Sequence, residues 1–542
     1  MYYPAAVSKG DNAKPRASFL RAAPAVVAVL TALVFLPSLR GAFLNFDDKG
    51  FLVLNEGYRG LGWPQLSWMF GSGSLLACNY SPLTWLTFGG DYLLWGMNPF
   101  GYHLTGILFH CANAVVFYFL CLEFFGRGTP ADKDRWAAAA AALLFSVHPL
   151  RVESAAWIFE RRDVVCGLFF LLTLLCWLRA ARPRQARPGR WRALAFVAFL
   201  LSLLSKAAAV PLPAVLILLD YWPLKRLTSL PWKKPEERAV WLEKIPFVLL
   251  ALVFAVLGAY AQAQCNAVVS LARTGPLERA WGALLGLAFY AGKTLWPARL
   301  SPMYEWHGAS LLTPILVGAA ALAAAFAAGW SDRRLRAPLL ASFGFYALML
   351  APALGLVKLG HQSAADRYSY LPCLAWALLA GAGLRLVPDS RRRPALGAAA
   401  FVLAALAGLT AAQTGIWRDS ASLWRRTLQL DPQSTVARQN LADGLLAQGR
   451  SGEAILMLEE QLRVYPGDND TRALLDQVLA QTHTTFKDHA RFHNDLGLEW
   501  AAKGEYGKAA WHFSKALEYD PDSAEIRANL DAARAKTAPG SR

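Results

Sequence analysis

The sequence predicts an all-α membrane protein, a bundle of membrane-spanning helices followed by a short soluble module of helical repeats. Hydrophobic residues make up 55% of the 542 residues and charged residues only 17%, whereas soluble domains are about a quarter charged. The apolar residues gather in blocks of about 15–22 residues, the length that a helix needs to cross a bilayer. After about Trp417 these blocks give way to amphipathic helices with charged faces.

The basic residues are distributed as in a membrane protein rather than a nucleic-acid-binding protein. The formal net charge is +17, but most Lys and Arg residues lie at the amino end or in short loops, where they orient helices. We therefore expect no nucleic-acid partner. The basic tail 1–22 precedes an apolar run, 24–39, that is too long and too rich in large residues for a cleaved signal peptide. This run predicts an uncleaved first crossing.

The apolar blocks predict about eleven crossings of the membrane. They lie at 23–40, 102–122, 136–147, 164–179, 192–208, 209–222, 245–262, 311–330, 337–357, 370–386 and 395–412. A further block at 280–297 is interrupted by Gly292, Lys293 and Pro297. We expect that block to be re-entrant or to pack along the outer interface.

The basic loops determine the predicted orientation, because Lys and Arg accumulate on the cytoplasmic side. These loops are the amino end, 123–135, 179–192, 225–244, 331–336 and 385–393. The arrangement requires that 280–297 does not fully cross, and it places the C-terminal module outside. The long loops that then open on the outer face are 41–101, 148–163, 263–310 and 358–369. Cys78, Cys265 and Cys373 fall in or near these loops, so one disulfide is allowed but not required.

Two stretches of the C-terminal module match the tetratricopeptide pattern, in which small residues let two antiparallel helices pack closely and proline ends the unit. They are 435–466, with Leu441, Ala442, Leu445, Gly449, Ala454, Leu458 and Pro466, and 490–521, with Leu496, Gly497, Trp500, Gly504, Ala509, Phe513, Ala516 and Pro521. Asp431-Pro432 stands about 34 residues before Pro466, so a degenerate unit is expected to lead in from the last crossing. The predicted domains are a cytoplasmic tail at 1–22, a membrane domain at 23–412 and an external repeat domain at 417–535.

An acidic pair, Asp47-Asp48, directly follows the first predicted crossing. Two adjacent carboxylates at the mouth of a crossing are costly unless they are exposed, paired or used. One of them could act as general base on an incoming hydroxyl while the other orients it or holds a cation. The alternative is a solvated loop start with Lys49 as a neighbour.

The second candidate segment, 148–163, combines acidic and basic side chains between two predicted crossings. Its candidate donor-binding residues are His148, Glu153, Arg161, Arg162 and Asp163. Arginine presents a planar fork of donors that suits phosphate oxygens. Because positive charge is disfavoured on the outer side, two consecutive arginines there predict an anionic partner. The alternative is a set of interfacial charges that pair with one another, for example Glu160 with Arg161.

Three further segments complete the candidate site. Lys206 lies near the outer end of a crossing, where an ammonium group inside an apolar run is a site hypothesis by default. The outer segment 358–372 carries Asp366 and Arg367, which we add to the donor-binding set. For Lys206 the alternative is pairing with an acid of the same bundle or snorkelling, and for 358–372 it is an aromatic-belt loop with an Asp–Arg pair. Side chains that could contact a sugar or acceptor are Tyr304, Glu305 and His307, for which interfacial packing is the favoured alternative.

In their order along the chain, these motifs resemble one family. An Asp-Asp pair in the first outer loop is followed by H-P-x-x-x-E, R-R-D, L-S-K-A, D-R-Y-x-Y-L-P and tetratricopeptide units. This order is similar to that of the transmembrane and tetratricopeptide repeat-containing O-mannosyltransferases and their bacterial relatives, within the GT-C glycosyltransferase superfamily. The resemblance runs from about residue 24 to about residue 530, and each motif is weak by itself.

The resemblance implies a GT-C-like helix bundle and a polyprenyl-phosphate-linked sugar donor that binds from the membrane at the outer face. The acceptor would be a hydroxyl of a protein Ser or Thr or of a glycan. The family's acidic pair corresponds to Asp47 and Asp48, with one of them as the base. Its other motif residues correspond to His148, Glu153, Arg162, Asp163 and Arg367. Animal members carry long repeat arrays, whereas this chain has few units.

The alternative to an enzyme is a membrane-anchored scaffold whose repeats recruit partners. A scaffold needs only one or two crossings, so the bundle favours the glycosyltransferase. A transporter is expected to have two-fold internal symmetry, which the sequence lacks. No glycine-rich phosphate loop, zinc-ligand spacing or G-x-S-x-G motif occurs in the sequence, and a divalent metal is allowed but not required. The Ala- and Arg-rich composition suggests a bacterial inner membrane, with the repeats in the periplasm.

Overall fold

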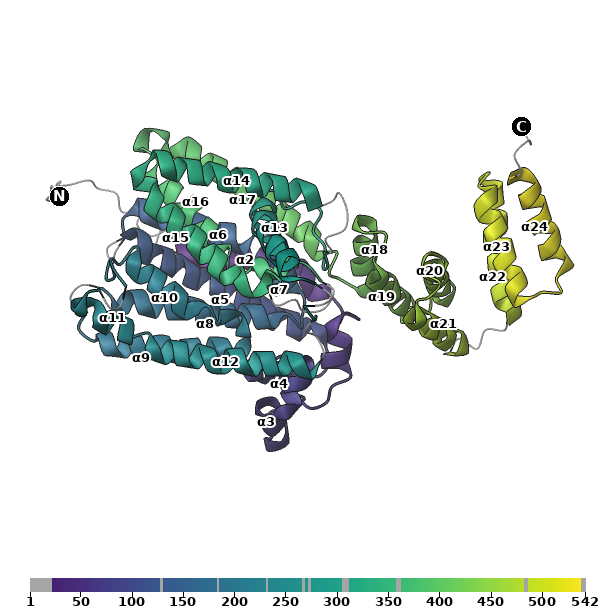
Figure 1. Cartoon of the computed structure of the whole chain (residues 1–542), viewed down its shortest axis with the longest axis horizontal. Helices are drawn as coiled ribbons and strands as arrows, with labels where there is room; N and C mark the ends of the chain where they lie inside the picture. Colours follow the sequence, from purple (N-terminus) through teal and green to yellow (C-terminus); the bar gives the residue numbers. More distant parts are fainter. Residues whose placement is uncertain are drawn as a thin grey trace. The chain divides into compact units, whose positions relative to one another are not determined.

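The computed structural model describes residues 22–126, 130–182, 185–230, 233–265, 269–271, 274–304, 311–356, 362–481 and 486–537. The chain divides into two compact units, Met1–Leu430 and Asp431–Arg542 (Figure 1). Throughout the described ranges the regular elements are helices, and the only extended pairing is an isolated bridge between Tyr304 and Ala364. The predicted all-α class is therefore confirmed.

The first unit contains a helix at each predicted crossing. Its α-helices are α2 (Ala23–Phe35), α3 (Trp63–Phe70), α4 (Pro82–Trp95), α5 (Pro99–Gly126), α6 (Asp132–Ser146), α7 (Val152–Ala156), α8 (Arg161–Ala180), α9 (Pro188–Ser205), α10 (Leu212–Tyr221), α11 (Arg238–Leu242), α12 (Ile245–Gln264), α13 (Pro276–Leu295), α14 (Leu312–Ser331), α15 (Arg333–Leu350), α16 (Leu374–Leu386), α17 (Asp389–Thr414) and α18 (Ser420–Leu430).

Among the described residues, seven helical segments are long and apolar enough to cross a membrane. They are Ala23–Arg40, Pro99–Gly126, Arg161–Ala180, Ile245–Gln264, Leu312–Ser331, Arg333–Ala353 and Asp389–Thr414. Two shorter apolar helices end at Tyr221 and Leu386. The protein is thus an integral multi-pass membrane protein, and the larger number of about eleven crossings stays a prediction.

Helix α8 lies at the centre of the first unit. In the most apolar stretch of α8, 78% of the residues are buried, compared with 6% in that of α17, which lies at the periphery. It packs against α5 and α9, and α9 in turn contacts α12 (Figure 1). Phe170, Leu171 and Leu174 of α8 are buried. A helix that begins with three charged residues, Arg161 to Asp163, is therefore held by its apolar length in the middle of the bundle.

Both ends of α13 lie at the same end of the bundle. At its start, Arg279 donates to the carbonyl oxygens of Val269 and Leu356, 2.7 and 3.2 Å away. At its end, the Thr294 carbonyl accepts a hydrogen bond from His148. These partners belong to the predicted outer loops or directly adjoin them, and that this block does not cross stays a prediction.

The residues that interrupt the apolar block at 280–297 do not break the helix before Leu295. The helix runs through Gly292 and Lys293 to Leu295. A β-carbon on Gly292 would lie 1.8 Å from the Pro314 carbonyl oxygen of α14, so glycine permits the two helices to approach. Lys293 donates to the carbonyl oxygens of Ala298 and Arg299, 2.8 and 3.1 Å away, which stabilises the chain after the helix end.

A disulfide joins two of the three cysteines expected in or near outer loops. Cys78, which follows the 3-10 turn η3 (Ser72–Ala77), is bonded to Cys265 at the end of α12, with a Cα–Cα distance of 5.7 Å. Cys373 is a free, buried thiol. The bond ties the end of α12 to the loop that precedes α4.

Six helices lie in the described residues of the second unit. They are α19 (Thr435–Leu446), α20 (Ser451–Val464), α21 (Asn469–Gln481), α22 (Phe486–Ala502), α23 (Tyr506–Tyr519) and α24 (Ala524–Thr537). The two predicted repeats coincide with the packed pairs α19–α20 and α22–α23. Gly449 and Gly504 adopt positive φ angles of 72° and 79° in the turns within these pairs, which favours glycine there. Their assignment to the tetratricopeptide class stays a prediction.

A buried histidine pair in the second unit predicts a stability that depends on pH. His493 Nδ1 lies 3.2 Å from His512 Nδ1, and His493 Nε2 lies 2.8 Å from Glu459. Burial lowers the pKa of His512 to about 4, and His493 acts in the same direction. The unfolded chain binds this proton below about pH 6.5. The free energy of unfolding should therefore fall as the pH decreases through this window.

We expect the second unit to be more easily unfolded at about pH 5 than at about pH 7. Pulse proteolysis of the full-length protein, scored by loss of a C-terminal tag, measures this difference. His512→Gln serves as the matched variant, because it removes the titrating group and should weaken the pH dependence. An equal pH dependence in both proteins would show that His512 does not cause it.

Candidate active site

Asp48 is a fully bonded, buried carboxylate that ties two loops together. Its Oδ2 accepts a hydrogen bond from the Leu44 amide at 2.9 Å. Its Oδ1 accepts from Trp157 Nε1 at 2.9 Å and from the Phe159 amide at 3.0 Å. Burial raises the pKa of Asp48 to about 7, while the two backbone hydrogen bonds lower it. Asp48 therefore fastens the loop after the first crossing to the segment before α8.

Asp47, its neighbour, is left unbonded. It is partly exposed, and it accepts no hydrogen bond and forms no ion pair with any residue that the structure describes. Burial raises its pKa, whereas the nearby charges of Arg162 and Arg367 lower it. Of the two predicted base candidates, only Asp47 has a carboxylate available to a substrate.

Glu160, just before α8, is surrounded by three cations. It forms ion pairs with Arg162 at 2.9 Å, with Lys206, and with Arg367 at 3.8 Å. Burial alone would raise the pKa of Glu160, but Arg162, Lys206 and Arg367 outweigh it and lower that pKa. The carboxylate is therefore ionised, and it assembles three positive charges at one place.

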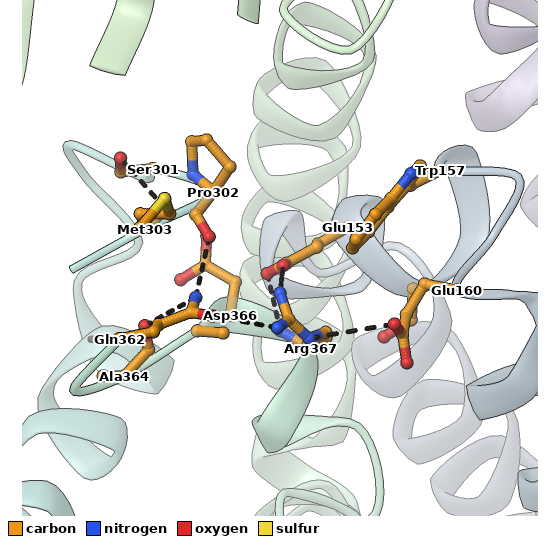
Figure 2. A network of polar contacts seen from close by, with 12 residues as sticks. Glu153, Trp157, Glu160, Ser301, Pro302, Met303, Gln362, Ala364, Asp366 and Arg367 are labelled. Carbon is orange, nitrogen blue, oxygen red and sulfur yellow. Dashed lines mark hydrogen bonds and ion pairs between the residues drawn. The ribbon is translucent and has the colours of Figure 1, made fainter. Parts of the chain in front are cut away.

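Arg367 lies between two acidic groups (Figure 2). It forms an ion pair with Glu153, and its own amide donates to Glu153 at 2.8 Å. Its Nη2 donates to Gln362 at 3.0 Å, and its guanidinium lies 5.5 Å from the centre of the Trp157 ring. These contacts orient the guanidinium from three sides, which pre-organises it for an anion.

Lys206 and Asp163 complete the cluster. Lys206 follows α9 directly and lies 2.8 Å from Asp163, which also accepts a hydrogen bond from Ser154 at 2.8 Å. The side chains of Arg162, Lys206 and Arg367 remain 9%, 16% and 11% exposed, whereas Glu160 is only 1% exposed. The part of the cluster that a ligand can reach is thus mainly cationic.

Arg161 lies apart from this cluster. Its guanidinium forms an ion pair with Asp91 of α4 and donates to the Tyr102 carbonyl oxygen at 2.6 Å. It also lies 4.4 Å from the centre of the Phe88 ring. Both partners of the pair are buried. Arg161 is therefore bound by partners outside the cluster, and the proposed donor site does not include it.

Three other predicted site residues hold the fold around the cluster. His148 accepts from the Leu150 amide at 3.3 Å, so its Nε2 donates to the Thr294 carbonyl at 2.9 Å, and burial lowers its pKa to about 3. Asp366 accepts from the Tyr304 hydroxyl at 2.9 Å. All three side chains are buried. Glu305 and His307 lie outside the described residues.

Sequence reasoning missed two parts of this region. Asp91, the partner of Arg161, is a lone carboxylate in an apolar stretch, which is itself a signal for a buried pair. Gln362, which orients Arg367, carries no such signal. Among the described residues, no group of three or more His, Cys, Asp or Glu side chains is arranged to hold a metal ion.

The fold and this cluster define a multi-pass helical membrane protein with a charged site at the ends of several helices. Its sequence is 34% identical over 174 residues to Protein O-mannosyl-transferase tmtc2 of Xenopus laevis, covering 30% of this chain and 19% of that one. It is 36% identical over 174 residues to Protein O-mannosyl-transferase TMTC4 of Homo sapiens, covering 29% and 23%. The resemblance that the motifs predicted is confirmed over about 30% of this chain.

The matched stretch spans only about a fifth of the length of these relatives. No protein-family model matches the chain. A crystal structure of ArnT from Cupriavidus metallidurans bound to undecaprenyl phosphate matches 86% of this chain and 79% of that one, with 15% sequence identity and a TM-score of 0.36. A TM-score this low does not establish a shared fold.

Proposed function

We propose that this protein is a membrane glycosyltransferase that moves a sugar from a polyprenyl-phosphate-linked donor to a hydroxyl acceptor at the outer face. The observation that carries the proposal is the contrast within the acidic pair. Asp47 presents an unbonded carboxylate beside the three-cation cluster. Both carboxylate oxygens of Asp48, in contrast, accept hydrogen bonds that hold the fold together. The similarity to O-mannosyltransferases supports the reaction class.

In the proposed reaction Asp47 is the general base. It removes the proton from the acceptor hydroxyl, whose oxygen attacks the anomeric carbon of the donor. The bond between that carbon and the phosphate oxygen breaks, and polyprenyl phosphate leaves with the electron pair. The transferred proton remains on Asp47 until solvent removes it.

Arg162, Lys206 and Arg367 stabilise the negative charge that grows on the leaving phosphate. Charge-assisted hydrogen bonds from such groups are about twice as strong as neutral ones. The side chain of Arg162 is 9% exposed beside its ion pair with Glu160, so part of it can face a ligand. Because Glu160 holds the cations in place beforehand, little reorganisation is needed when the charge develops.

The acceptor side of the proposal follows from the predicted orientation. The site residues 47, 160 and 367 lie in or beside loops that the positive-inside rule places outside. We therefore propose a protein Ser or Thr, or a glycan, of the outer compartment as acceptor, with the second unit on the same side. In a bacterial cell this compartment would be the periplasm.

Release of polyprenyl phosphate tests the proposal. The purified full-length protein in lipid is incubated with a panel of labelled polyprenyl-phosphate sugars, with and without a hydroxyl acceptor. At least one donor should release polyprenyl phosphate at a rate that the acceptor increases. If no donor of the panel turns over, the alternative of a membrane-anchored repeat scaffold is favoured.

The disulfide provides a separate test of the orientation. If Cys78 and Cys265 face an oxidising compartment, both should resist a maleimide reagent in protein isolated without reductant and react after reduction. A gel-shift reagent reports this directly. Cys78→Ser is the matched control, because it leaves the Cys265 thiol free before reduction. Two reactive thiols in untreated wild-type membranes would place the loops in a reducing compartment.

The rate should fall at acid pH as Asp47 becomes protonated. Burial raises the pKa of Asp47 and Arg162 lowers it, so Arg162→Gln should raise this pKa further. The acid limb of kcat/KM should then move to higher pH. Rate profiles from about pH 4 to about pH 9 measure the shift. Arg182→Gln, beyond the far end of α8, should leave the limb in place, and an unmoved limb in Arg162→Gln would contradict the assignment.

A further inference from the structure

The segment that follows α17 is bonded to the loop of the proposed base. The Ala42 amide donates to the Arg418 carbonyl at 2.9 Å. The Asn45 amide donates to Ser420 Oγ at 2.9 Å, and Trp424 Nε1 donates to Asn45 Oδ1 at 2.7 Å. Residues more than 370 positions apart are thus joined by three hydrogen bonds within the first unit.

An aromatic cluster reinforces this contact. The Phe46 ring is stacked on Trp157, with centroids 4.7 Å apart, and meets the edge of Trp424 at 5.2 Å. Trp417 stacks against Trp157 at 5.6 Å. All three tryptophans are almost completely buried. Such a packed group of rings leaves the Phe46 side chain little freedom.

The two neighbours of Asp47 are therefore the groups that determine where its carboxylate lies. Phe46 is held by the aromatic cluster, and Asp48 is held by Trp157 and the backbone. Asp47 itself forms no hydrogen bond or ion pair with a described residue, so beyond the nearby charges of Arg162 and Arg367 its position depends on these two neighbours. A displacement of Phe46 would therefore also displace Asp47.

We propose that α18, through Trp424 and with Trp417 before it, is a positioning element of the active site. The inference rests on the proposed function, because it assigns Asp47 as the base. In this proposal α18, the first helix after the last crossing, positions the catalytic base. The sequence pattern had placed the same helix in the repeat domain. The helix ends at Leu430, where the second unit begins.

The kinetic test uses Trp424→Phe in the full-length protein. This variant keeps an aromatic ring against Phe46 but removes the hydrogen bond to Asn45. We expect kcat to fall by about 10- to 100-fold, because small displacements of a catalytic group have effects of this size, while the donor KM stays within about twofold. Trp511→Phe in α23 is the matched control and should retain wild-type kcat. A rise in KM with unchanged kcat, or no change, would overturn the proposal.

A labelling test separates this inference from the enzymatic proposal. Asp47→Cys is introduced, and its reaction with a membrane-impermeant maleimide is followed in the Trp424, Trp424→Phe and Trp511→Phe backgrounds. Four of the five native free thiols are buried, and the parent without the new cysteine corrects for the rest. The rate should rise at least about fivefold in Trp424→Phe as the loop opens more often.

The two experiments fail in different ways. If wild-type protein turns over no donor but the labelling rate rises in Trp424→Phe, the enzymatic proposal fails and the positioning contact stands. If the labelling rate is equal in all three backgrounds, α18 does not control the position of residue 47, whatever the activity.

Discussion

Asparagine in place of Asp47 is expected to lower kcat by about 100- to 10,000-fold, the contribution of a general base. The amide has the same shape but cannot accept the proton of the acceptor. The protein should remain folded, because Asp47 makes no hydrogen bond or ion pair with the described residues and its charge is destabilised by burial. Turnover of a labelled donor and the thermal unfolding temperature measure both effects on one preparation.

Asp48→Asn is the matched comparison, one residue away and of the same chemistry. Three N–H groups converge on the two oxygens of Asp48. An asparagine has only one oxygen, so at least one buried donor loses its acceptor, which costs about 1–3 kcal/mol. This variant should therefore lose stability as well as activity, whereas Asp47→Asn should lose activity alone.

Chemical rescue distinguishes a base from a residue that only shapes the loop. In Asp47→Ala, added formate can occupy the vacant space and accept the proton, so part of the turnover should return. Asp48→Ala should not respond, since formate cannot replace three fixed hydrogen bonds and the loop they hold. Retention of more than about a tenth of wild-type turnover by Asp47→Asn would disprove the base assignment.

The helices of the first unit were largely predictable because a membrane crossing is a local signal. A block of about twenty apolar residues forms a helix in a bilayer whatever surrounds it. Predictions made from single residues were less secure. Gly292 and Lys293 interrupt the apolar pattern at 280–297, yet α13 runs through both, and the glycine lets α14 approach.

The composition of the candidate site was predictable, but its pairing was not. Loop positions and the positive-inside rule place the acidic and basic residues at one end of the bundle. They do not say which groups pair, because Arg161 and Arg162 are adjacent in sequence yet point about 100° apart on a helix. The partner of Arg161 is Asp91, seventy positions earlier, and the contacts of α18 join still more distant segments.

The adjacent arginines lead to the second large expected effect. Arg162→Gln should lower kcat/KM by about 100- to 1,000-fold, the cost of removing one charge-stabilising donor from a reacting centre. Its stability should change little, because Glu160 keeps Lys206 and Arg367 as partners. Steady-state kinetics with a labelled donor and the thermal unfolding temperature give both numbers.

Arg161→Gln should show the opposite pattern. It leaves Asp91 buried without its cation, and breaking a buried ion pair costs about 3–5 kcal/mol. We expect a lower unfolding temperature and less folded protein, with kcat/KM per folded molecule within about threefold of wild type. The double replacement of Arg161 by Met and Asp91 by Leu removes both charges together and should recover part of the stability. A contrary result would be loss of turnover in fully folded Arg161→Gln with turnover retained in Arg162→Gln. Arg161 rather than Arg162 would then bind the phosphate, and the role assigned to the cluster around Glu160 would be wrong.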